Sequence, residues 1–140
     1  ETMRTALFLL SLLSVANSYK FLVYSSQSGK SHVNFLARIS DILVDAGHEV
    51  VMLSPIMNSL IGGPMTDKAR VIEIPQCKES AEFEDFINNK MSQNVWVQNP
   101  FMMFLNQGAM FENWVKTCES VIHHPGLIEQ LKAEKFDAAF

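Results

Sequence analysis

The sequence predicts an α/β fold built on a doubly wound, Rossmann-like parallel sheet, and three features of residues 20–53 predict it. Residues 21–24, Phe-Leu-Val-Tyr, form a short apolar run that is typical of a buried strand. A turn rich in glycine and serine follows, and apolar residues then recur at helical spacing from Leu36 to Ala46. After Gly47, placed where a left-handed helix cap belongs, residues 49–53 begin a second apolar strand. Such a compact strand–helix–strand unit forms a right-handed parallel crossover, which starts a doubly wound sheet.

Residues 1–18 have the pattern of a secretory signal peptide. Met3 is the expected natural start, Arg4 follows it, residues 6–16 are apolar, and small residues stand where a signal peptidase cleaves. The apolar run is too short for a comfortable membrane span, and a buried strand or helix is the less favoured alternative. We therefore expect residues 19–140 to form the mature domain.

Composition narrows the class of protein. The chain has 140 residues, enough for one domain with a hydrophobic core. Its formal net charge of −4 gives no indication of nucleic-acid binding, which usually depends on a basic patch. No Cys/His spacing typical of a metal site is present, so we predict no metal. A secretory route permits a disulfide, and pairing of Cys77 with Cys118 is left open, with two buried thiols as the favoured alternative.

Five further elements are expected downstream. Residues 70–74 alternate enough for a third strand, and Ser80 is expected to cap a polar helix that runs to about Lys90. A long helix is expected at residues 101–122 and a short one at residues 127–135. Phe136 then begins a strand without a following helix, so we expect this chain to be a fragment of a longer protein.

The long helix is apolar on two neighbouring faces. We therefore expect it to be buried or to line a cavity, with an apolar acceptor pocket as the functional alternative. The stripes comprise Phe101, Phe104, Leu105, Phe111, Val115, Cys118 and Ile122 on one face and Met103, Met110 and Trp114 on the next. The preceding helix is expected to expose its acidic residues to solvent, namely Glu79, Glu82, Glu84 and Asp85.

Residues 28–31, Ser-Gly-Lys-Ser, look like the end of a P-loop, but Tyr24 replaces the glycine that opens that motif. The loop then lacks the usual backbone cradle for phosphates, so a nucleotide binder that depends on Lys30 is a weak alternative. The Gly-x-Gly-x-x-Gly fingerprint is absent after both early strands, which argues against a nicotinamide or flavin enzyme. Gly29 is expected to take backbone angles that other residues avoid.

His32 is the candidate catalytic residue. It follows the carboxyl end of the first strand, where open α/β sheets bind their ligands. At a helix N-terminus the dipole disfavours a positive charge, which favours the neutral imidazole that a general base requires. A histidine bonded in a surface turn is an equally weighted alternative. His48 is expected to be a helix-exit residue, and His123 and His124 are expected to be solvated.

Three segments carry a resemblance to a known family. They are residues 29–35 (Gly-Lys-Ser-His-Val-Asn-Phe), residues 39–43 (Ile-Ser-Asp-Ile-Leu) and residues 46–50 (Ala-Gly-His-Glu-Val). Together they resemble the amino terminus of UDP-glucuronosyltransferases, and the nematode branch most of all. Lys30 is a departure, because the family is expected to carry small or histidine-like residues in that neighbourhood.

The resemblance implies a GT-B fold, of which this chain resembles the incomplete amino-terminal, acceptor-binding half. Members of the family transfer a sugar, usually glucuronic acid, from a UDP-sugar to a small lipophilic acceptor, with inversion and without an obligatory metal. Carried over to this sequence, His32 is the general base that takes the acceptor proton. An acidic residue that orients this base is expected just beyond Phe140, and Asp137 is not put in its place.

The resemblance also implies partners and a location. The UDP-sugar is a co-substrate and no cofactor is implied, whereas a homo-oligomer is left open. The implied location is the lumen of the endoplasmic reticulum, with a membrane anchor in a carboxyl-terminal part outside this sequence. The 140-residue chain alone is expected to transfer no sugar. The alternative function is a non-catalytic secreted half-domain that binds lipophilic compounds.

Overall fold

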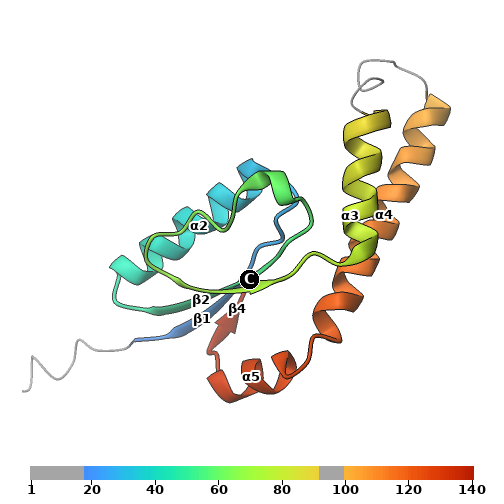
Figure 1. The fold of residues 1–140 in the computed structure, drawn as a ribbon. Coiled ribbons are helices and arrows are strands. Elements are labelled where there is room, and N and C mark those ends of the chain that lie inside the picture. The colour runs from blue at the N-terminus through green and yellow to red at the C-terminus, as the bar shows by residue number, and fades with distance from the viewer. Residues whose placement is uncertain (1–17, 92–99) are drawn as a thin grey trace, which may run out of the picture.

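The computed structural model describes residues 18–91 and 100–140 (Figure 1). The predicted signal peptide, apart from Ser18, lies outside the described residues. No helix within the two described stretches is long and apolar enough to cross a membrane.

Four parallel strands form one sheet in the order β3-β2-β1-β4. They are β1 (Lys20–Tyr24), β2 (Glu49–Pro55), β3 (Arg70–Ile74) and β4 (Ala138–Ala139). The register pairs Lys20 with Glu49 and Tyr24 with Leu53, so the carboxyl ends of β1 and β2 meet at one edge. The predicted Rossmann-like α/β fold class is confirmed.

Helices cover both faces of this sheet (Figure 1). On one face α2 (Lys30–Asp45) packs over a core of buried side chains from itself and the strands, namely Val23, Ala37, Val50 and Met52. On the other face α5 (Leu127–Glu134) and the end of α4 (Pro100–Ile122) close a second core with Leu53 and Ile74. Alternate residues of β1 enter the two cores because successive side chains of a strand point to opposite faces.

The end of α2 matches the sequence prediction. Gly47 has a φ of +88°, the left-handed conformation that glycine adopts without strain. The Gly47 N–H donates to the Val44 carbonyl at 2.9 Å, and the His48 N–H donates to the Leu43 carbonyl at 3.1 Å. These bonds end the helix and turn the chain directly into β2.

Two helices, α3 (Lys78–Phe86) with its π-helical extension η2 (Ile87–Met91) and α4, lie side by side as a hairpin beyond the sheet (Figure 1). The prediction that Ser80 caps α3 is wrong, because the cap position is Cys77, three residues earlier, and Ser80 is the third residue of the helix. The Ser80 hydroxyl is fully buried and donates to Asn113 Oδ1 at 2.7 Å, and it also bonds Thr117 Oγ1 at 2.9 Å. The Ser80 hydroxyl therefore bonds side chains of α4 and not the backbone at the start of its own helix.

The buried side of α4 also differs from the predicted stripe. Asn113, Thr117 and Val121 are buried at a spacing of four residues. Large side chains of the predicted stripe are exposed instead, namely Phe101, Phe111, Val115 and Ile122. The stripe was misplaced because a polar seam with Ser80, which hydrophobic periodicity cannot detect, joins the two helices. The side chains of Met103, Phe104 and Leu105 lie outside the described part.

The two cysteines are free thiols. The Cys77 thiol is half-buried and donates to Ser80 Oγ at 3.1 Å, whereas Cys118 is exposed. The expectation of two buried thiols is therefore wrong for Cys118, which lies on the solvent side of α4.

Candidate functional site

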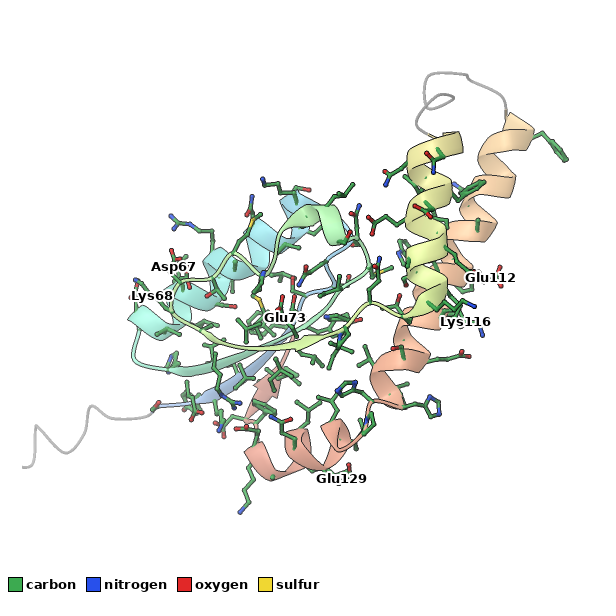
Figure 2. The ribbon with its side chains drawn as sticks, in the orientation of Figure 1. Asp67, Lys68, Glu73, Glu112, Lys116 and Glu129 are labelled. Carbon is green, nitrogen blue, oxygen red and sulfur yellow. The ribbon has the colours of Figure 1, made fainter. Side chains whose placement is uncertain are left out.

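The loop from β1 to α2 is held at the carboxyl edge of the sheet by Gln27. This side chain is 2% exposed, and its Nε2 donates to Ser54 Oγ at 3.2 Å and to Glu73 Oε1 at 2.9 Å (Glu73 is labelled in Figure 2). Ser54 in turn donates to the Ser25 carbonyl at 3.1 Å. One amide therefore connects the loop to β2 and β3 together.

Backbone bonds reinforce this attachment. The Gln27 N–H donates to the Pro55 carbonyl at 2.9 Å, and the Asn58 N–H donates to the Gln27 carbonyl at 3.0 Å. The loops that leave β1 and β2 are thus tied to each other, and the start of α2 has a fixed position above the sheet edge.

Gly29 precedes α2 for a reason different from the expected one. Its φ of −157° and ψ of 134° are extended values that any residue adopts, so the prediction of unusual backbone angles is wrong. A Cβ atom at this position would lie 3.1 Å from His32 Nδ1. The glycine therefore gives room to the imidazole.

His32 is the third residue of α2, and its side chain is exposed at the edge of the sheet. Its Nδ1 lies 3.4 Å from Ser31 Oγ, and the first turn of α2 contains no acidic residue. The imidazole lines a pocket of about 280 Å³ between this edge and the α3–α4 hairpin. Apolar walls come from three separate segments, namely Met57 after β2, Phe83 and Ile87 of α3 and its extension, and Met110 and Trp114 of α4.

Polar groups complete the lining, and one of them is charged. Besides His32, the polar lining residues are Ser28, Asn58, Glu84 and Asn113. The pocket therefore combines a candidate proton acceptor with a mostly apolar wall, the usual composition of a small-molecule site.

Glu84 is the site residue that sequence reasoning missed. Its carboxylate accepts hydrogen bonds from the Ser59 N–H at 2.8 Å, the Ser59 hydroxyl at 2.7 Å and Gln76 Nε2 at 2.8 Å. Burial raises the pKa of Glu84, but these three bonds outweigh burial and hold the pKa below its ordinary value. The expectation of a solvated Glu84 is wrong in part: the side chain is half-buried, because Ser59 of the 3₁₀ turn η1 (Ser59–Ile61) bonds its carboxylate.

The remaining histidines lie away from the pocket. His48 Nδ1 accepts from the Tyr19 N–H at 3.4 Å, and its ring contacts Phe21, so it belongs to the amino edge of the sheet. His123 Nδ1 is 2.8 Å from the Glu119 carbonyl at the exposed end of α4. Within the described stretches, no group of His, Cys, Asp or Glu side chains is arranged to hold a metal ion.

Asp137 also belongs to the amino edge. Its Oδ2 accepts from the Lys20 N–H at 2.7 Å, at the first residue of β1. His32 follows the last residue of that strand, so the two side chains lie at opposite ends of β1.

The sequence of residues 20–140 matches the family described as UDP-glucoronosyl and UDP-glucosyl transferase. The chain belongs to this family. The family predicted from the sequence is therefore confirmed, and the parallel sheet with its flanking helices is consistent with the amino-terminal half of a GT-B glycosyltransferase.

Individual relatives agree with this assignment. The chain is 32% identical over 141 residues to UDP-glucuronosyltransferase ugt-48 of Caenorhabditis elegans, covering 94% of this chain and 25% of that protein. It is 25% identical over 142 residues to UDP-glucuronosyltransferase 1A6 of Homo sapiens, covering 100% of this chain and 26% of that protein. The chain thus spans about a quarter of the length of these curated relatives. No solved structure gives a significant match.

Proposed function

We propose that this chain is the acceptor-binding part of a UDP-glycosyltransferase and that His32 is the general base. The observation that carries the proposal is that His32 shares one pocket with the apolar side chains of Phe83, Met110 and Trp114. An apolar wall holds the carbon skeleton of a lipophilic acceptor, and the imidazole is then within the same space as its hydroxyl group.

The proposed reaction is a single displacement. The acceptor oxygen forms a bond to the anomeric carbon of the sugar as the bond from that carbon to the UDP oxygen breaks. UDP leaves with the electron pair, and the hydroxyl proton passes to His32. Because Nδ1 faces Ser31 Oγ at 3.4 Å, we assign proton uptake to Nε2.

An acidic residue that orients His32 is proposed to follow Phe140 in the full-length protein. The Tyr24 N–H donates to the Phe140 carbonyl at 2.8 Å, so β4 runs along β1 toward the edge that carries the His32 loop. Ser25, next along β1, is 1% exposed, and its hydroxyl has no hydrogen-bond partner among the described residues. A carboxylate at this place would satisfy that hydroxyl and support the base.

Replacement of the base tests the role of His32. In a full-length enzyme that carries this domain, His32→Ala is expected to lower turnover about 10²-fold or more, the usual contribution of a general base. The affinity for the UDP-sugar should stay unchanged. His123→Ala, at the exposed end of α4, is the matched control. Unchanged turnover of His32→Ala would remove this residue from the mechanism.

The 140-residue chain by itself is proposed to bind acceptors without transferring sugar, since the donor would be bound mainly by a second domain. We also propose a lumenal, membrane-anchored location in the endoplasmic reticulum for the full-length protein. Incubation of the purified chain with a UDP-sugar and a phenol, followed by product analysis, tests the first statement. Detectable conjugate would contradict it.

A further inference from the structure

The pocket beside His32 has an uneven charge. Among its described lining residues, Glu84 is the one carboxylate, and no lysine or arginine is present. A ligand in this pocket therefore meets a fixed negative charge and no fixed positive charge.

The charge of Glu84 is not neutralised by its partners. The backbone and hydroxyl of Ser59 and the amide of Gln76 are all neutral donors. They hold the carboxylate at a fixed position between α3 and η1 and stabilise its ionised form. The negative charge is therefore a permanent part of the wall at neutral pH.

A neighbouring hollow on the hairpin adds further negative charge. It has a volume of about 290 Å³, shares Phe83 and Asn113 with the pocket, and is lined by Glu79, Glu82 and Glu112. Lys116 is the cation in its lining, and it is paired with Glu119 at 3.0 Å (Figure 2 places Glu112 and Lys116 on α4). The surroundings of the pocket on the hairpin are therefore acidic as well.

We infer that Glu84 is a specificity-determining residue that selects against anionic acceptors, so that neutral hydroxyl compounds and cations bind better than carboxylates of the same shape. The inference rests on the proposed acceptor pocket. A five- to tenfold difference in affinity corresponds to about 1.0–1.4 kcal/mol, which is the upper end of what solvent-screened charge pairs contribute at a protein surface. Carboxylic acids should accordingly be poor acceptors, whereas phenols and alcohols should be good ones.

Three ligands with one ring system and different charges test the inference. Naphthoate, naphthalenemethanol and naphthylmethylammonium suit a pocket at the small end of the range for ligand sites. Calorimetry with the 140-residue chain is expected to give naphthoate a dissociation constant five- to tenfold above that of the alcohol. The cation should bind at least as tightly as the alcohol.

The variant Glu84→Gln retains a hydrogen-bonding side chain at this position and removes the charge, and it should bring the anion and the alcohol within about twofold of each other. Asp85→Asn removes the same charge from the next residue of α3, which does not line the pocket, and should preserve the discrimination. A melting curve of each variant checks that it is folded. In the unaltered chain, raising the salt concentration from about 0.01 M to about 1 M should likewise bring the affinities for the anion and the alcohol closer together.

The outcomes separate the inference from the proposed function. Equal affinities for all three ligands in the unaltered chain, or discrimination that persists in Glu84→Gln, would overturn the role of Glu84 and leave the acceptor pocket standing. Failure of all three ligands to bind would overturn the acceptor pocket itself, and the inference with it.

Discussion

The two edges of the sheet are built from different interactions. At the amino edge, the Lys20 ammonium pairs with Glu49 at 2.8 Å and with Glu134 of α5, and Glu134 also pairs with Arg70 of β3. At the carboxyl edge, the buried amide of Gln27 connects the ends of the same strands. Surface ion pairs tolerate small displacements, whereas buried hydrogen bonds depend on geometry. The edge with the stricter geometry is the one that carries the candidate base.

The largest effect is expected at the carboxyl edge. Gln27→Ala removes a buried amide and leaves Ser54 and Glu73 without this donor, so we expect it to lower the free energy of unfolding by about 2 kcal/mol. It should also weaken ligand binding, because the His32 loop loses its attachment. Urea unfolding measures the first effect. Gln130→Ala, on the exposed side of α5, is the control and should stay within about 0.5 kcal/mol. Equal losses of unfolding free energy in Gln27→Ala and Gln130→Ala would contradict the structural role given to Gln27.

Gly29→Ala should displace the His32 imidazole with little change in the free energy of unfolding. The extended backbone accepts alanine, which costs nothing in conformation and restricts the unfolded chain, so the free energy of unfolding should change by less than about 1 kcal/mol. The new methyl group would crowd His32 Nδ1, 3.1 Å away, and displace the imidazole. Turnover of a full-length enzyme with this substitution is expected to fall several-fold, as misplaced catalytic groups lose rate steeply. Full activity would show that the imidazole adjusts freely.

The smallest effect is expected at the amino edge and depends on pH. Hydrogen bonds from Lys20 and then from Arg70 hold the pKa of Glu134 below its ordinary value of 4.5. A lowered pKa stabilises the fold above the unfolded-state value, and this contribution disappears as the pH falls through the folded-state value. The urea midpoint of Glu134→Gln should therefore lie slightly below that of the unaltered chain at neutral pH. At about pH 3 the two should approach each other. If the difference between the two urea midpoints were the same at neutral pH and at about pH 3, ionisation of Glu134 would be excluded as its cause.

The sequence predicted the part of the fold that local patterns determine. The strand, turn, helix and strand of residues 20–55 could be placed because apolar spacing and Gly47 are local signals. The position of His32 at the carboxyl edge followed from the same pattern. Periodicity could not place the polar seam of Ser80, Asn113 and Thr117, because this seam depends on which faces of two separate helices meet.

Only part of the candidate site was predictable from the sequence. His32 was singled out from the loop that carries it, and Met110 and Trp114 were named as one alternative for an acceptor wall. Glu84 was assigned to a solvated face because its three donors come from residues 59 and 76, and helical spacing says nothing of them. Contacts between distant segments, rather than residue type, decide which charged side chains line a pocket.

The polar seam between α3 and α4 has a consequence for how this pocket can diversify. Hydrogen bonds at fixed atoms favour one alignment of the two helices, since sliding by one turn would break the buried bonds from Ser80 to Asn113 and Thr117. Met110 and Trp114 lie on either side of Asn113 along α4 and line the pocket. Their side chains can therefore be exchanged for others while the helix alignment stays the same. Such a hairpin would let the pocket take a different shape without a change of fold.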